Sequence, residues 1–287
     1  MHTPHRFTAA LALVAACLLA ATAAWSGIRP SAVRDWAEPH MRAPRARIDG
    51  SRVTIRDVRN FEFDSQGPTL LRWDERTYDL DALASVWYIV TPFDTDWRGP
   101  AHAFLSFGFD DGRFLAVSIE ARREQGEEYS MVRGLLKGFE LIYVFGDERD
   151  LIGARVLAQQ DELYLYPVRA THSAMRGLFL DVLERANALA ERPEFYGTLR
   201  NNCTTAILDH VNTVLDRPIR WGLRVLLPGY SDALALRHGL LDTELSLEAA
   251  RDRFHANERI RRFADAPDFS ARIRATPDPD GEAAASR

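Results

Sequence analysis

Apolar and polar residues alternate along the first half of the folded part of the chain, which is the spacing of β-strands with one buried face. Two short alternating runs flank Asp49, Gly50 and Ser51, a sequence typical of a tight hairpin turn. Further runs rich in β-branched and aromatic residues predict strands over 76–80, 85–93, 101–109, 113–121, 139–146 and 161–168. We therefore expect a largely antiparallel sheet.

The apolar spacing changes to that of a helix in the second half of the chain. An apolar stripe predicts a long helix over 173–191, which Pro193 ends. A second helix is expected to begin at Cys203, with Asn202 as its N-cap, and to end at Asp216. Strands followed by helices predict an α+β domain with a mainly antiparallel sheet and a cysteine-bearing helix.

The chain begins with an apolar segment. Residues 7–26 carry no charge and are about as many as a helix needs to cross a bilayer, so 1–26 are predicted to be a signal peptide or a transmembrane anchor. Residues 27–45 are rich in Pro, Arg and Ala and are expected to form a linker or a strap along the surface. The folded domain is predicted over 46–270, and a disordered tail over 271–287.

Composition narrows the class of protein. Apolar residues make up 46% of the chain, enough for a sizeable core, and the formal net charge is -5. Proteins that bind nucleic acid usually carry a basic surface, so nucleic acid is not an expected partner. The sequence contains no Walker-type loop, no dinucleotide-binding glycine motif and no zinc motif, and we expect no cofactor.

Cysteine usage identifies a candidate nucleophile. The chain has two cysteines, and Cys17 lies in the apolar segment, so Cys203 cannot form a disulfide within the folded domain. The first turn of a helix offers free backbone N–H groups and a partial positive charge, which favour a thiolate. The alternative is that Cys203 is a small apolar residue of the core.

A nucleophilic thiol needs a base, which is most often histidine. The candidates after the apolar segment are His40, His102, His172, His210, His238 and His255. His210 lies two helical turns beyond Cys203, too far for a direct hydrogen bond. His102 is distinguished because it begins a predicted strand next to a sharp hairpin.

The hairpin after His102 supplies a carboxylate. If residues 110–112 form the loop, counting back along both strands places His102 opposite Glu120. Glu120 would then accept the Nδ1 proton of the imidazole and leave Nε2 for Cys203. A one-residue slip would bring Ser118 into that role instead. The alternative is that His102 is a core histidine and Glu120 begins an exposed charged run.

Four stretches together resemble a known bacterial family: "HAFLSFGFDDGRFLAVSIEARREQGEEYS", "ELIYVFGDERD", "ALAERPEFYGTLRNNCTT" and "GYSDALALRHGLLDT". This family is named after the N-terminal periplasmic domain of the Lnb-type lipoprotein N-acyltransferases, and the resemblance covers about residues 48–269. It implies a circularly permuted papain-like (NlpC-type) fold in which the histidine strand precedes the cysteine helix. It also implies that Cys203 is the nucleophile and His102 the base, whereas Glu120 comes from the hairpin register alone.

Together these observations predict a cysteine-dependent enzyme that works through an acyl-thioester. A phospholipid or a lipoprotein at the membrane surface is the expected substrate. The expected location is the periplasmic face of the bacterial inner membrane, or the periplasm if residues 1–26 are cleaved. Two alternatives stay open: a cell-wall amidase or endopeptidase with the same two residues, and an inactive periplasmic scaffold or binding module.

Overall fold

The fold is built around one large mixed sheet. A computed structural model describes residues 4–64, 67–94 and 98–275. Within them an eight-stranded sheet has the order β1-β2-β9-β8-β7-β6-β10, and β5 pairs with β2. The strands are β1 (Arg45–Asp49), β2 (Arg52–Arg59), β5 (Trp73–Asp79), β6 (Leu83–Pro92), β7 (Ala101–Phe109), β8 (Phe114–Arg122), β9 (Glu140–Gly146) and β10 (Tyr164–Pro167). All pairs are antiparallel except β2 with β9, which confirms the α+β class with a mainly antiparallel sheet.

Both predicted hairpins form. The β1–β2 hairpin pairs Asp49 with Arg52, and Gly50 at its turn has a φ of 62°. In the β7–β8 hairpin the N–H of Phe109 donates to the carbonyl oxygen of Arg113 across the expected loop. The left-handed backbone at Gly50 suits glycine, because glycine has no Cβ and adopts a positive φ without steric cost.

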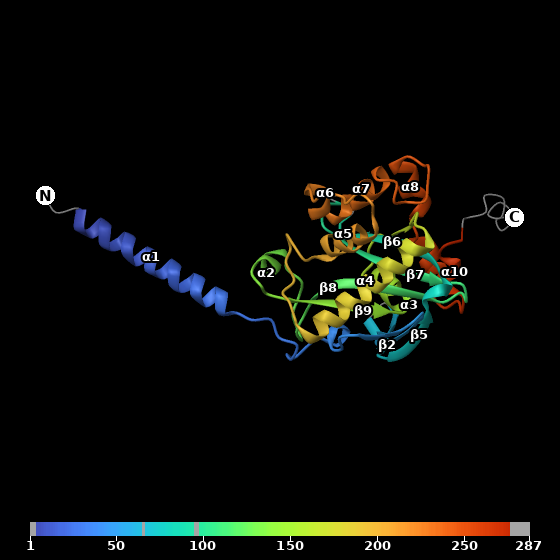
Figure 1. The fold of residues 1–287 in the computed structure, drawn as a ribbon, viewed down its shortest axis with the longest axis horizontal. Coiled ribbons are helices and arrows are strands. Elements are labelled where there is room, and N and C mark those ends of the chain that lie inside the picture. The colour runs from blue at the N-terminus through green and yellow to red at the C-terminus, as the bar shows by residue number, and fades with distance from the viewer. Residues whose placement is uncertain (1–3, 65–66, 95–97, 276–287) are drawn as a thin grey trace.

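Helices cover both faces of the sheet. α4 (His172–Glu191) and α5 (Cys203–Val214) pack on one face, where alternate residues of β7 such as Leu105 and Phe107 join the larger core (Figure 1). On the other face Phe104 belongs to a second core with α3 (Glu148–Gly153), α9 (Asn257–Arg262) and α10 (Phe269–Arg272). The alternation along β7 therefore assigns His102 to the same face as Phe104.

The chain before β1 has two parts, of which only the second lies against the body. α1 (Pro4–Gly27) projects away from the body (Figure 1). Among residues 4–64, 67–94 and 98–275, no helix combines the length and the apolar character needed to cross a membrane. The strap, residues 27–45, contributes Trp36 and His40, which are both buried. The strap is therefore packed on the body through these two side chains.

Several short elements have too few residues to produce a readable period, and the sequence patterns did not predict them. They are β3 (Glu62–Asp64), β4 (Gly67–Leu70), α2 (Met131–Leu135), α8 (Leu247–Phe254) and the helices α3, α9 and α10. Residues 221–241 have the composition of short helices and turns, and α6 (Leu223–Leu226) and α7 (Ser231–Arg237) lie there.

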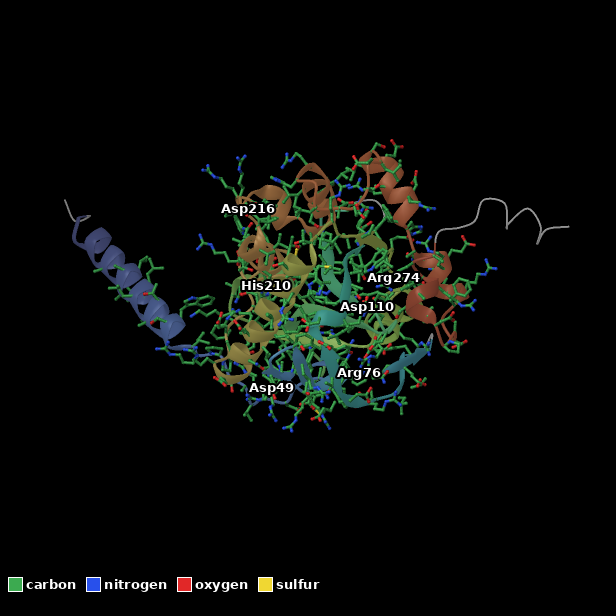
Figure 2. All side chains as sticks on the ribbon, turned by 45° about the vertical axis from the view of Figure 1, so that its right-hand side comes forward. Asp49, Arg76, Asp110, His210, Asp216 and Arg274 are labelled. Atoms are coloured by element: carbon green, nitrogen blue, oxygen red, sulfur yellow. The ribbon has the colours of Figure 1, made fainter. Side chains whose placement is uncertain are left out.

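The predicted C-terminal tail begins too early. Residues 271–275 belong to the fold, because Ile273 is fully buried and the guanidinium of Arg274 donates to Glu148 at 2.7 Å. Arg274 also lies 3.8 Å above the ring of Phe114, against the body of the protein (Figure 2). The rest of the predicted tail, 276–287, lies outside the described residues.

Candidate active site

A cavity opens where the β7–β8 ladder stops. The ladder runs from Gly108 paired with Phe114 to Phe104 paired with Ser118. Beyond this last pair lies a cavity of about 410 Å³. Its walls include His40, His102, Ser118, Glu120, Tyr129, Arg155, Tyr196 and Cys203. Residues from the strap, the sheet, α5 and the loop before α5 therefore meet at one site.

Cys203 is the first residue of α5, as predicted. Asn202 forms a capping box with Thr205, in which its side chain accepts from the Thr205 N–H. Cys203 is buried, with 4% of the residue exposed. Burial raises the pKa of Cys203, although the N–H groups of Ala103 and Thr204 contact the sulfur and favour its thiolate form.

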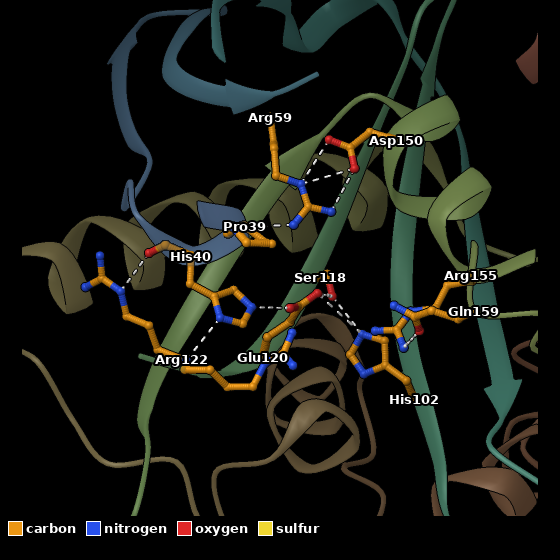
Figure 3. Close-up of polar contacts among 11 residues, drawn as sticks. Pro39, His40, Arg59, His102, Ser118, Glu120, Arg122, Asp150, Arg155 and Gln159 are labelled. Carbon is orange, nitrogen blue, oxygen red and sulfur yellow. Dashed lines mark hydrogen bonds and ion pairs between the residues drawn. The ribbon is translucent and has the colours of Figure 1, made fainter. Parts of the chain in front are cut away.

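His102 faces the cavity from β7 and is held by Ser118. Its Nε2 lies 2.7 Å from Ser118 Oγ, and Ser118 Oγ donates to Glu120 Oε1 at 2.7 Å (Figure 3). Burial, and after it the positive charge of Arg155, lower the pKa of His102 to about 3. The imidazole is therefore neutral at physiological pH.

The hairpin register is the predicted one, but the hydrogen bond is not. The last pair of the ladder, Phe104 with Ser118, has the predicted register, which places Glu120 opposite His102. Glu120 Oε1 nevertheless lies 4.0 Å from His102 Nε2, and Ser118 makes the direct hydrogen bond. The reason is geometric, since Ser118 is the diagonal neighbour of His102 on the same face. Nε2 is the bound nitrogen, so Nδ1 is the one left for Cys203.

His102 and Cys203 line one cavity without being bonded to each other. Within the part of the chain that the structure describes, no hydrogen bond joins the imidazole to the thiol, and the sulfur lies 3.7 Å from Thr204 Oγ1. Hydrogen bonds between a base and a nucleophile are often long before substrate binds. The geometry thus brings the two predicted residues to the same cavity as a neutral pair.

His40 is a site residue that the sequence did not reveal. Its Nε2 lies 2.8 Å from Glu120 Oε2, and its Nδ1 accepts from the Arg123 N–H at 3.0 Å. Burial lowers the pKa of His40. Burial disfavours the charged form of Glu120, but the hydrogen bond with His40 outweighs this and holds the pKa of Glu120 well below its usual value. The segment around His40 has no hydrophobic periodicity, so no local pattern marked this histidine.

Arginine side chains also line the cavity. Arg59 is held by Asp150 through a buried ion pair with an Nη2 to Oδ1 distance of 2.8 Å. Arg155, on the π-helical turn Ala154–Ala158, lies 3.6 Å from Asp161 and donates to Gln159. Across the described residues, no cluster of three or more His, Cys, Asp or Glu side chains could hold a metal ion.

His210 occupies a different environment. It lies on α5 and is buried (Figure 2). Its Nε2 is 2.6 Å from Tyr143 Oη and its Nδ1 is 2.6 Å from Asp181 Oδ2. It therefore bonds to β9 and α4 and not to Cys203, which agrees with the distance argued from the helical repeat.

These features define an α+β protein whose cavity gathers a helix-start cysteine and a strand histidine. A family model described as the Lnb N-terminal periplasmic domain matches residues 69–227, more than half of the chain, and includes both His102 and Cys203. The chain therefore belongs to this family of periplasmic domains. No curated protein matches the chain. No solved structure matches it.

Proposed function

We propose that this protein is a cysteine-dependent enzyme that transfers or hydrolyses an acyl group through a thioester on Cys203. The observation that carries the proposal is the meeting of Cys203 and His102, which are far apart in sequence, at one cavity. The position of the thiol beside the N–H groups of Ala103 and Thr204 supports it further. The order of histidine strand and cysteine helix also fits a circularly permuted papain-like fold, which is part of the proposal.

In the first half of the reaction, Nδ1 of His102 takes the thiol proton as the sulfur of Cys203 attacks the acyl carbonyl carbon. A C–S bond forms, and the carbonyl oxygen becomes an oxyanion beside the N–H groups of Ala103 and Thr204. Collapse of this intermediate breaks the bond to the leaving oxygen or nitrogen. The leaving group takes the proton from His102, and a neutral thioester remains.

In the second half, an amine or a water molecule attacks the thioester carbonyl carbon. His102 accepts the proton of the attacking group, the C–S bond breaks, and the proton returns to the sulfur of Cys203. An amine gives acyl transfer, and water gives hydrolysis. Atoms and charges balance in both cases, with no oxidant or metal required.

A lipid or lipoprotein is the substrate that the surroundings of the cavity favour. Tyr129 lines the cavity and leads directly into α2, which is bound to the loop before Cys203 because the Thr198 hydroxyl donates to the Met131 carbonyl oxygen at 2.7 Å. The apolar side chains of α2 and its surroundings are about half exposed or more, namely Met131, Val132, Leu135, Leu136 and Leu199. Such a patch beside an active site is typical of a surface that contacts lipid or protein.

A second cavity is the place that we propose for part of an acyl chain. It has a volume of about 90 Å³ and lies along α5, lined almost entirely by apolar side chains such as Ile207 and Leu208. Thr204, the residue after Cys203, is one of its lining residues. We include in the proposal that residues 1–26 export the protein or hold it at the periplasmic face of the inner membrane.

The proposal is tested by intact-mass analysis of the full chain purified from membranes. We expect a hydroxylamine-sensitive fatty-acyl adduct on the wild type, and none on Cys203→Ser. His102→Ala is expected to reduce it strongly, because the thiol then lacks its base. An adduct made of cell-wall peptide would support the amidase alternative. Retention of full cellular function by both variants, with no adduct on the wild type, would support an inactive scaffold.

A further inference from the structure

We infer that His40, in the strap, is a positioning residue that acts through Glu120 and Ser118 to fix which ring nitrogen of His102 carries the proton. This inference rests on the proposed role of His102 as the base. It is carried by an unbroken series of hydrogen bonds whose direction can be assigned from one end to the other (Figure 3).

The donor and acceptor roles in this series can be assigned from the backbone N–H of Arg123. The N–H of Arg123 can only donate, so Nδ1 of His40 is an acceptor and carries no proton. A neutral imidazole with a bare Nδ1 must carry its proton on Nε2. Nε2 of His40 therefore donates to Glu120 Oε2 at 2.8 Å.

The Glu120 carboxylate then determines which atoms donate and accept at Ser118. Because the pKa of Glu120 lies well below its usual value, its carboxyl group is ionised at neutral pH. Both oxygens therefore accept, one from His40 and the other from the Ser118 hydroxyl at 2.7 Å. A hydroxyl group has one proton, and that of Ser118 is committed to Glu120. Ser118 Oγ must then accept from Nε2–H of His102 at 2.7 Å. Nδ1 of His102 is left with its lone pair, as a base toward Cys203 requires.

His40 is fixed by contacts other than its own ring. Its carbonyl oxygen accepts from Arg122 Nε at 2.9 Å, and the carbonyl oxygen of Met41 accepts from Arg122 Nη2 at 3.1 Å. The same guanidinium lies 4.2 Å above the ring of Trp36. These contacts hold the strap on the sheet, so a substitution of the His40 side chain should leave the strap in place.

Three substitutions of the full chain separate positioning from packing. His40→Phe keeps a ring but removes both polar atoms, whereas His40→Gln places an amide donor near the position of Nε2. Ser118→Ala removes the acceptor of the His102 Nε2–H. It provides the reference ¹⁵N spectrum of an imidazole that Ser118 does not hold. Circular dichroism and thermal unfolding establish that each variant is folded.

The main measurement is the ring ¹⁵N chemical shifts of His102 at pH 7, because these shifts differ between the two neutral tautomers. We expect the Nε2–H tautomer in the wild type and in His40→Gln, and a shift toward the Ser118→Ala spectrum in His40→Phe. The inference is overturned if the wild type carries the proton on Nδ1. It is also overturned if His40→Phe keeps the wild-type shifts while Ser118→Ala changes them.

A second measurement distinguishes this inference from the proposed function. Site-resolved mass spectrometry follows alkylation of Cys203 by iodoacetamide in the same variants. We expect His40→Phe to slow it about tenfold and His40→Gln to restore it, since hydrogen bonds to charged groups contribute about this much. If His102→Ala leaves the alkylation rate unchanged, the proposed base fails, while the ¹⁵N result still decides the role of His40.

Discussion

His102 and His210 stand in two hydrogen-bond networks made of the same kinds of group. His102 contacts a hydroxyl group that leads to a carboxylate, and His210 contacts the Tyr143 hydroxyl and the Asp181 carboxylate directly. Both histidines are buried, and burial lowers the pKa of each. They differ in what lies on the open side, because only His102 borders the cavity that contains the Cys203 thiol.

The comparison shows that a histidine with an acid and a hydroxyl group is not by itself a site. In the His210 network, both ring nitrogens have protein partners, so the group ties α5 to β9 and α4. In the His102 network one nitrogen has a protein partner and the other has none among the described residues. The candidate site is distinguished by a histidine that lines the same cavity as a thiol and has one ring nitrogen without a partner among the described residues, and not by the number of polar contacts.

The largest expected difference between the networks concerns the reactivity of Cys203. His102→Ala should slow alkylation of Cys203 by iodoacetamide at pH 7 by roughly a hundredfold, the lower part of the range for loss of a general base. The matched variant, His210→Phe, should leave the rate unchanged. Site-resolved mass spectrometry of the full chain measures both. If Cys203 is alkylated at the same rate in the wild type and in His102→Ala, the two histidine networks do not differ in their effect on the thiol.

The second difference concerns stability. His210→Phe should lower the free energy of unfolding by about 1–3 kcal/mol, because the buried Tyr143 hydroxyl loses its partner. His172→Ala, at the exposed start of α4, should change it by less than about 0.5 kcal/mol. Urea denaturation followed by circular dichroism gives both values. If His210→Phe leaves the free energy of unfolding unchanged, this network does not hold the helices together.

The third prediction concerns pH. Because burial lowers the pKa of His210 in the folded protein, the unfolded chain binds more protons as pH falls below about 6.5. The free energy of unfolding should therefore decrease from pH 7.5 to pH 5, by at most about 1.4 kcal/mol per pH unit for each such histidine. The decrease should be smaller in His210→Phe.

Glu120 should not contribute in that interval. Its pKa lies well below the usual value in the folded protein, so its stabilisation is complete above about pH 4.5 and is lost only as pH falls further, toward its folded pKa. Urea denaturation at pH 5, 6 and 7.5 tests these signs. A wild-type stability that rises toward pH 5 would contradict the assignment of neutral, buried histidines.

The smallest expected effect concerns the patch on α2, which adjoins the His102 cavity. Val132→Asp and Leu136→Asp place a charge on side chains that are 63% and 54% exposed, so the fold should tolerate them. If the patch contacts lipid, each should reduce transfer from phospholipid vesicles to Cys203 by about tenfold, because the apolar contact is lost. Ile48→Asp, on the edge strand β1, is the control. If all three variants transfer from vesicles at the same rate, α2 does not contact the substrate.

Much of the fold and part of the site follow from local patterns. The strand over 101–109 and the helix start at Cys203 were predicted from residue spacing and from the N-cap Asn202, and the structure has both. The hairpin register was readable because 110–112 allow a single short loop. Short elements such as α2 were missed, because five residues show no period.

The sequence by itself determined the elements that carry His102 and Cys203, since periodicity, capping and turn residues act over a few positions. Only the tertiary structure decided that Ser118 and not Glu120 touches the imidazole, because a diagonal contact depends on how side chains fill the space between two strands. Only the tertiary structure brought His40 to Glu120 across 80 positions of the chain. No local pattern encodes such a contact, because it exists only once the strap has packed against the sheet.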